Sequence, residues 1–328
     1  MKKRTNRMKG VALTLLAGLL SVALLAGCAA QKEETLSAPL KIGTLNGPTG
    51  IGMVKLMEAP DQYQVTAFQS PDEAVAKIVT GELDIAAVPS NLGAVLYNKL
   101  EGDIVLLGTN TLGVLYIVEN GDAVSEIADL KGKTIIASGK GGSPEFILNQ
   151  LLRSAGLDPA MDVTVNWMMN HTDVSSALMA QPGSIAMLPQ PFVTIVTEKN
   201  SAVRMAVDLN AAWEETQNAA LPMGVIVAQK SVVEERKGDI GIFLDAYAES
   251  VGFVNAEPAE AAKLVAKYGI IADQTIAEKA IPSCNIVFIP AGEAKADLNR
   301  FYEIISGMDS KSVGGKIPDE AFYYSPEE

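Results

Sequence analysis

Small polar residues and glycines lie in loops that follow apolar segments of the chain, and such loops could bind an anion or a polar carbonyl group. Glycine lets a backbone N–H group approach a ligand closely, because it has no Cβ atom. Where such a loop leads into a helix, the first N–H groups and the positive end of the helix dipole favour an oxyanion. The candidate ligand-binding residues are Asn46, Gly47, Thr49, Gly50, Ser70, Ser90, Asn91, Ser138, Gly141, Gly142, Ser143 and Gln190.

Each candidate also has an explanation that needs no ligand. Ser70, Ser90 and Ser143 are of the residue type that caps helix N-termini, and the glycines could serve only to form turns. The sequence therefore does not separate a cap from a ligand contact at any single position. What favours a binding site is that the candidates come from two halves of the chain with the same pattern.

The first repeated unit is a strand, a glycine-containing loop and a helix, and it recurs after about ninety residues. The expected segments are 40–45, 46–50 and 51–57 in the first half, and 133–137, 138–143 and 144–155 in the second half. Ser143 is the expected N-cap of the second helix, since Pro144 suits its first turn. The repeat places both glycine-containing loops at the start of a helix.

The second repeated unit is an apolar strand that ends in proline and a polar residue. Residues 83–90 align with residues 183–190, and helices are expected to follow over 92–100 and 192–199. An amphipathic helix precedes each strand, and Ser70 begins the first of them. Strands that alternate with helices at this interval predict two α/β lobes, each a mainly parallel sheet flanked by helices.

Two further strands, 113–118 and 224–228, begin with glycine and mark where the chain would cross between the lobes. Residues 231–307 are mostly helical in pattern and would pack back on the first lobe, which makes that lobe discontinuous. In open α/β sheets, ligands bind beyond the carboxyl ends of the strands. Loops from both lobes would then form the walls of one cleft.

The composition indicates a large acidic body with enough apolar residues for two cores. The chain has 328 residues, 48% of them apolar, and a formal net charge of −13. Removal of residues 1–27 would take away five basic and no acidic residues, which gives −18. Such a balance argues against nucleic acid as a partner. Apart from Cys28 the chain has one cysteine, Cys284, which we expect to be a small buried side chain.

The N-terminal segment predicts export and a lipid anchor. Five basic residues precede an apolar run over 11–25, as in a secretory signal peptide. The run ends in Leu25, Ala26, Gly27 and Cys28, which resemble the lipobox of bacterial lipoproteins, where cleavage leaves a lipidated cysteine as the first residue. Residues 28–38 would be a flexible tether. The alternative is an uncleaved transmembrane anchor over 11–30.

Several other chemistries lack support, so we expect no catalytic residues, no metal and no cofactor. The order of residues 139–143 does not fit a phosphate-binding loop, and the glycines over 47–52 do not fit a dinucleotide fingerprint. His171 is the single histidine, which leaves a histidine metal site or a Ser-His triad unsupported. We expect His171 in a loop or at a helix start, with a position in the cleft left open. Core packing is expected for Trp213 and Tyr116.

Together, the lipobox, the two lobes and the helical return resemble the solute-binding proteins of bacterial ABC importers. Residues 46–50, 81–86 and 129–135 are most similar to the nitrate/sulfonate/taurine-type branch, which includes thiamine-precursor binders. The resemblance implies the type II periplasmic binding fold, with two hinge crossings. The expected parts are a signal peptide (1–27), a tether (28–38), lobe 1 (39–118 and 225–328) and lobe 2 (119–224).

The resemblance also implies a function and its partners. The protein would be a monomer on the extracytoplasmic face, held to the membrane by its lipid alone, that delivers a small molecule to ABC permease subunits and their ATPase. Two alternatives are an enzyme of pyrimidine or thiamine-precursor synthesis on the same scaffold and a ligand sensor for a membrane signalling protein. Lys140 is the only cation in the candidate loops, which favours a monoanion or a neutral polar heterocycle over a dianion.

Overall fold

The computed structural model describes residues 35–326, and Leu36–Glu328 forms one compact unit. The predicted signal peptide, the lipidation site at Cys28 and most of the predicted tether lie outside the described residues. Within the described part of the chain, no helix combines the length and apolar character that a membrane span requires.

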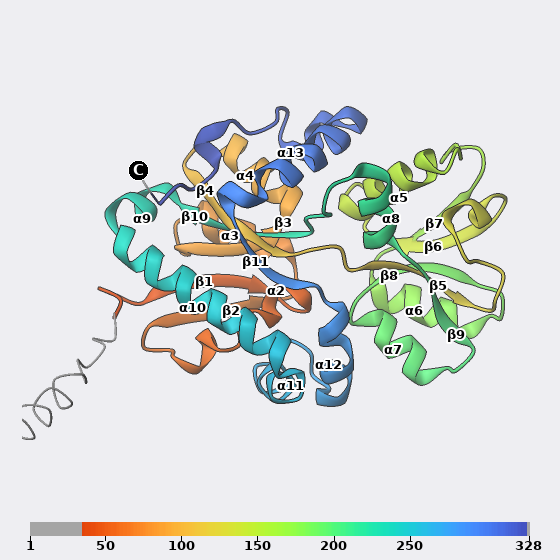
Figure 1. The fold of residues 1–328 in the computed structure, drawn as a ribbon, viewed down its shortest axis with the longest axis horizontal. Helices are drawn as coiled ribbons and strands as arrows, with labels where there is room; N and C mark the ends of the chain where they lie inside the picture. Colours follow the sequence, from red (N-terminus) through yellow and green to blue (C-terminus); the bar gives the residue numbers. More distant parts are fainter. Residues whose placement is uncertain (1–34, 327–328) are drawn as a thin grey trace, which may run out of the picture. The chain divides into compact units, whose positions relative to one another are not determined.

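Lobe 1 is built on a six-stranded mixed sheet with the strand order β11-β4-β10-β3-β1-β2 (Figure 1). Its strands are β1 (Leu40–Leu45), β2 (Tyr63–Phe68), β3 (Ile85–Pro89), β4 (Ile104–Thr111), β10 (Gly224–Gln229) and β11 (Ile286–Pro290). The expected parallel pairing joins β1 to β2 and β3, whereas β10 and β11 run antiparallel to their neighbours.

Lobe 2 repeats this arrangement in a five-stranded sheet with the order β7-β6-β8-β5-β9. Its strands are β5 (Leu115–Asn120), β6 (Thr134–Ser138), β7 (Thr164–Met168), β8 (Ile185–Pro189) and β9 (Val203–Asp208). The parallel strands are β6, β7 and β8, and β5 lies antiparallel between β8 and β9. The two-lobed α/β fold expected from the sequence is therefore confirmed, with mixed sheets.

Each sheet contains one strand that the chain forms directly after it crosses from the other lobe, and we call these two strands, β5 and β10, the exchanged strands. In lobe 1 the strand next to β3 is β10, which follows lobe 2 in the sequence, and in lobe 2 the strand next to β8 is β5, which follows β4 of lobe 1. Pro89 of β3 pairs with Gly224, and Pro189 of β8 pairs with Leu115. Residues 115–118, grouped with lobe 1 in the sequence, thus lie in the sheet of lobe 2. The chain crosses between the sheets over 112–114 and over 209–223.

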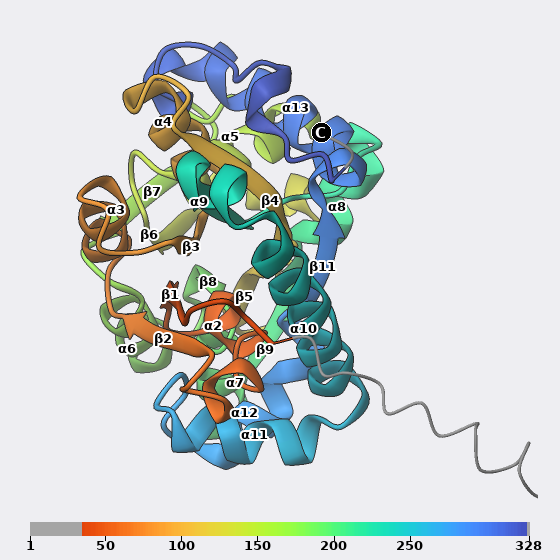
Figure 2. The ribbon, with the colours of Figure 1, turned by 90° about the vertical axis from the view of Figure 1, so that its left-hand side faces the viewer.

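Helices cover both faces of each sheet (Figure 2). They are α2 (Pro48–Ile51), α3 (Pro71–Val79), α4 (Ser90–Lys99), α5 (Ser143–Ser154), α6 (His171–Ala180), α7 (Phe192–Lys199), α8 (Leu209–Gln217), α9 (Lys230–Glu235), α10 (Lys237–Ala256), α11 (Pro258–Lys267), α12 (Gln274–Ala280) and α13 (Ala291–Met308). Along β3, Ala86 and Val88 pack in one apolar cluster while Ile85 and Ala87 pack in another, because successive side chains point to opposite faces.

The expected helix over 51–57 is wrong. The structure has a short helix, α2, and then a 3-10 turn at Leu56–Glu58. Two glycines interrupt the segment, and glycine is a poor helix former. Both are required by close packing: a Cβ atom on Gly50 would lie 2.4 Å from the carbonyl oxygen of Leu45, and one on Gly52 would lie 2.5 Å from the Tyr247 hydroxyl.

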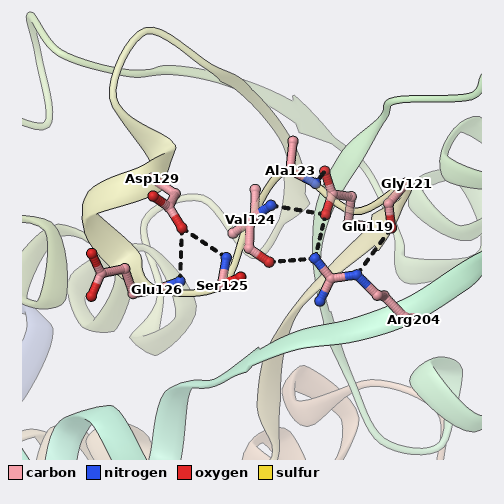
Figure 3. Close-up of polar contacts among 8 residues, drawn as sticks. All are labelled: Glu119, Gly121, Ala123, Val124, Ser125, Glu126, Asp129 and Arg204. Atoms are coloured by element: carbon pink, nitrogen blue, oxygen red, sulfur yellow. Dashed lines mark hydrogen bonds and ion pairs between the residues drawn. The ribbon is translucent and has the colours of Figure 1, made fainter.

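An ion pair with a buried carboxylate and a partly exposed guanidinium stabilises the end of lobe 2 that is remote from the strand ends at Ser138 and Pro189. The Glu119 side chain on β5 is only 2% exposed, and its carboxylate lies 2.9 Å from the Arg204 guanidinium on β9 (Figure 3). The N–H groups of Ala123 and Val124 also donate to this carboxylate. Arg204 in turn donates to the carbonyl oxygens of Gly121 and Val124. The pair thus orders the loop that follows β5.

Candidate functional site

The parallel strands of both sheets end in loops that begin helices, and these two sets of loops meet at the boundary between the lobes. Strands β1, β2 and β3 lead into α2, α3 and α4, while β6, β7 and β8 lead into α5, α6 and α7. The Ser143 hydroxyl at the start of α5 donates to the side-chain oxygen of Asn91 in α4, at 3.1 Å. A Cβ atom on Gly47 would lie 4.0 Å from Pro191. The loops of the two lobes therefore face each other.

Ser90 is completely occupied by bonds within the protein. Its side chain is buried, and its hydroxyl donates to the carbonyl oxygen of Pro222 at 2.5 Å. Its N–H donates to the Met223 carbonyl, and its own carbonyl accepts from the Tyr302 hydroxyl. Both donors of this buried residue, the hydroxyl and the N–H, are thus used within the protein, which leaves none for a ligand.

Asn91 is buried and bonded on both sides. Its amide nitrogen donates to the Ser312 carbonyl at 3.5 Å, in the segment that follows α13. Its amide oxygen accepts from Ser143 of lobe 2. The residue therefore connects the C-terminal segment of lobe 1 to the first turn of α5.

The loop between β1 and α2 is shaped by its glycines and by buried polar groups. Asn46 is half-buried, and its N–H bonds to Phe68. Gly47 adopts a φ of 87°, which favours glycine, and its N–H donates to Ile270. The carbonyl oxygen of Thr49 accepts from the side chains of Thr44 and Asn110. Gly50 is buried and is explained by steric need alone.

Ser70 is an N-cap, which is one of the two roles, helix cap or ligand contact, that the sequence allowed. Its hydroxyl accepts the N–H of Asp72 at 3.1 Å in the first turn of α3. This bond lies within the first turn of α3, and no hydrogen bond among the described residues joins Ser70 to the candidates of lobe 2.

The expected N-cap role of Ser143 is wrong. The N-cap of α5 is Gly142, and Ser143 is the first helical residue, which frees its hydroxyl for the bond to Asn91. Gly142 donates its N–H to Gly139, and Gly141 donates its N–H to Glu145 at 2.6 Å. Gly141 is exposed and has a φ of 78°.

Gln190 is buried at the end of β8 and folds back on α7. Its amide oxygen accepts from the hydroxyl of Thr194 at 2.8 Å and from the N–H of the same residue at 3.3 Å. Because the oxygen is used twice, the amide NH2 group is the end that remains for another acceptor.

Ser138 and His171 form a pair that the sequence did not reveal. Ser138 ends β6 and is buried, and its hydroxyl lies 2.7 Å from the Nδ1 atom of His171 at the start of α6. The imidazole packs on Phe192 of α7 with ring centroids 5.1 Å apart. Burial lowers the pKa of His171 below its ordinary value. The ring is therefore neutral at physiological pH.

The remaining aromatic and sulfur groups belong to the core. Trp213 is fully buried and packs edge-on against Phe301 of α13, with ring centroids 5.9 Å apart. Tyr116 is buried, and its hydroxyl donates to the Ser283 carbonyl. Cys284 is buried, and burial raises its pKa to about 12, so the thiol stays protonated. The core positions expected for all three residues are confirmed.

A family model described as "NMT1/THI5 like" matches residues 64–261, which is more than half of the chain. The chain belongs to the NMT1/THI5-like family. The family match confirms the resemblance that the sequence alone indicated, and it covers loops of both lobes. A comparison with curated proteins found no match.

Solved structures share the fold over nearly the whole described part of the chain. An ABC transporter from Parabacteroides distasonis has 27% identity and a TM-score of 0.77, with 88% of this chain and 99% of that chain covered. The periplasmic aliphatic sulphonate binding protein SsuA from Escherichia coli has 17% identity and a TM-score of 0.72, with 88% and 92% covered.

A third structure of the same fold contains a bound molecule. The alkanesulfonate-binding protein SsuA from Xanthomonas axonopodis pv. citri, bound to MOPS, has 16% identity and a TM-score of 0.61, with 87% and 96% covered. The two SsuA structures are named as binding proteins, and the likeness confirms the two-lobed type II periplasmic binding fold.

Proposed function

We propose that this protein is the extracytoplasmic substrate-binding component of an ABC importer and that it captures a small polar or anionic solute between its two lobes. The observation that carries the proposal is the meeting of two sets of helix N-termini at the lobe boundary. Helix N-termini present unpaired N–H groups and a positive dipole end, so they suit an oxyanion or a carbonyl group. The name of the Xanthomonas relative, an alkanesulfonate-binding protein, supports such a ligand class.

The chemistry of the boundary favours recognition by hydrogen bonds and not by ion pairing. The polar side chains at these strand ends and helix starts are uncharged: Asn91, Ser143, Gln190, Ser138 and the neutral ring of His171. The charged pair that also joins the lobes, Lys279 of α12 and Glu198 of α7, is exposed and its charges neutralise each other. Lys140 is exposed in the loop before α5. A monoanion or a neutral polar molecule therefore fits better than a dianion, because each added charge would need a buried counter-charge.

A thermal-shift screen of purified residues 29–328 tests the proposal. The probes are ethanesulfonate, taurine, nitrate, bicarbonate, pyrimidines and amino acids. A probe at one hundred times its dissociation constant adds about 2.7 kcal/mol to the free energy of unfolding, which is easily measured as a higher melting temperature. A protein whose melting temperature responds to none of these probes contradicts the proposal.

The Gln190 NH2 group offers a sharper test of where the solute binds. Gln190→Ala is expected to weaken the binding of the best probe about fivefold, which corresponds to about 1 kcal/mol for one hydrogen bond. Gln181→Ala is the matched control, since Gln181 is an exposed residue at the end of α6. Calorimetry that gives equal affinities for both variants would remove Gln190 from the site.

The membrane anchor and the permease belong to the same proposal. The lipobox supports lipidation of Cys28, which would keep the binding lobes beside permease subunits and their ATPase. Cys28→Ala should release the protein from membranes in detergent-free fractionation. Retention equal to that of the unaltered protein would favour an uncleaved anchor helix instead.

Capture itself would proceed by hinge closure. The segments 112–114 and 218–223 belong to the two crossings between the sheets, and we propose them as the hinge between lobe 1 and lobe 2. A solute that contacts both lobes stabilises the closed form by its differential contacts. Small-angle scattering should then show a smaller radius of gyration with a saturating probe, and an unchanged radius would contradict closure.

A further inference from the structure

The pair formed by Ser138 and His171 lies at the carboxyl edge of the lobe 2 sheet, where the loops face lobe 1. Ser138 ends β6, His171 follows β7, and Phe192 follows β8, so the three residues come from three neighbouring strand ends. Pro191, next to Phe192, lies close to Gly47 of lobe 1. The imidazole is therefore beside the boundary at which the proposed solute would bind.

The hydrogen-bonding needs of Ser138 fix the position of the imidazole proton. Ser138 is buried, and its contact with His171 is the one hydrogen bond of its hydroxyl among the described residues. If Nδ1 carried the proton, the buried hydroxyl proton would have no acceptor, which is costly. The hydroxyl therefore donates to Nδ1, and the ring proton is on Nε2.

The Nε2 atom is left with a donor that the protein does not use. Among residues 35–326, His171 makes one side-chain hydrogen bond, through Nδ1, and the residue is partly exposed. Asp173, two residues further along α6, bonds to Asn170. Burial is the one cause of the lowered pKa of His171, and no charged group of the described residues contributes to it.

We propose that His171 is a ligand contact of the cleft, held by Ser138 as a neutral Nε2–H donor that selects solutes with a hydrogen-bond acceptor and disfavours cations. Ser138 is then a positioning residue and does not itself touch the solute. This assignment rests on the proposed solute-binding function. It identifies the side chain that contacts the solute and predicts that the contacted group is a hydrogen-bond acceptor.

Because the chain has one histidine, nuclear magnetic resonance can observe this ring alone in a protein prepared without a histidine tag. Histidine labelled with ¹⁵N should show a neutral ring at pH 7.5 with its proton on Nε2. The best probe of the thermal-shift screen, for example ethanesulfonate, should shift the Nε2 resonance at saturation. A proton on Nδ1, or a charged ring at this pH, would overturn the assignment.

Variants separate contact from positioning. His171→Phe should weaken the binding of that probe about fivefold, whereas His171→Gln, whose amide nitrogen can replace Nε2–H, should retain more affinity. Ser138→Ala should mix the two tautomers of the ring and weaken binding, and Ser138→Thr, which keeps the hydroxyl, should restore both. Ser176→Ala is the control, since Ser176 is exposed on the same helix and bonds only within it.

The outcomes distinguish this assignment from the proposed function. If a probe binds, yet the ring resonances do not change and His171→Phe binds it as the unaltered protein does, the assignment is wrong while the binding function stands. If no probe raises the melting temperature, the binding function fails and the assignment fails with it.

Discussion

Strands β3 and β8 end in the same pattern, a proline followed by polar residues, yet the two lobes use those residues differently. After Pro89, the polar groups of Ser90 are bonded to Pro222, Met223 and Tyr302. After Pro189, the amide oxygen of Gln190 accepts from Thr194 of α7, and its NH2 group makes no hydrogen bond among the described residues. We call the residues that follow β3 the wall of lobe 1 and those that follow β8 the wall of lobe 2. The donors of Ser90 in the wall of lobe 1 are therefore used within the protein, whereas Gln190 in the wall of lobe 2 keeps an amide donor for a solute.

The difference follows from what covers each wall. In lobe 1, Tyr302 of α13 and the later residue Ser312 reach the strand end and occupy Ser90 and Asn91. The corresponding end of lobe 2 receives no bond from this C-terminal segment among the described residues. We infer that the strand end of lobe 1 keeps its conformation when a solute binds and that lobe 2 supplies the side chains that form specific hydrogen bonds to the solute.

The largest effect is expected where lobe 2 depends on its own charges for stability. Glu119→Ala would leave the N–H groups of Ala123 and Val124 without their acceptor and the Arg204 guanidinium without its counter-charge, and should lower the free energy of unfolding by about 3 kcal/mol. Denaturant titration measures this loss. Glu82→Ala is the control in lobe 1, because its pair with Lys77 is exposed and should matter little.

A smaller loss is expected from the closed wall of lobe 1. Ser90→Ala would leave the buried Pro222 carbonyl unpaired and should lower the free energy of unfolding by about 2 kcal/mol. The affinity for the best probe should stay unchanged, in contrast to Gln190→Ala. A Ser90→Ala protein that keeps its stability but binds the probe weakly would reverse the roles of the two walls.

The bond between the walls should have a still smaller effect, on closure and not on folding. Ser143→Ala removes the hydrogen bond to Asn91 across the lobes, and a loss of about 1 kcal/mol would shift the equilibrium between closed and open forms about fivefold toward the open form. Small-angle scattering without any probe should then give a larger radius of gyration. No change in radius would mean that other contacts hold the lobes together.

The smallest effect concerns pH. Burial lowers the pKa of His171 in the folded protein, so below about pH 6.5 the unfolded chain binds a proton more readily than the folded one. The stability linked to the neutral ring is thus complete above that pH and is lost as the pH falls through the folded value. The stability difference between the unaltered protein and His171→Gln should change in this sense between pH 8 and pH 5, and a constant difference would contradict it.

Local sequence signals predicted many of the elements, although not the interrupted segment over 51–57, but they did not predict the contacts. The cap at Ser70 and the helix Phe192–Lys199 were predicted as they occur, because caps and apolar periodicity are properties of neighbouring residues. A serine that caps and a serine that reaches another lobe look alike in sequence. Ser143 bonds to a residue 52 positions away, and Ser90 bonds to one 132 positions away.

For the same reason, the sequence did not predict the two polar side-chain pairs of lobe 2. Nothing near Ser138 indicates that His171, which lies 33 residues later, will accept its hydroxyl proton. Glu119 and Arg204 are 85 residues apart and meet only because β5 and β9 are adjacent strands. Such partners depend on the sheet order, which the repeat suggested only in part.

The exchanged strands β5 and β10 have a consequence for the order in which the two lobes can fold. All five strands of lobe 2 lie within residues 115–208, so that sheet can be completed from one continuous segment. In lobe 1, β4 pairs with β10 and β11 and forms a bridge to Tyr323, all of which come more than one hundred residues later. A chain that emerges from its N-terminus would therefore complete lobe 2 first, and β4 would wait without neighbours until the end of the chain arrives.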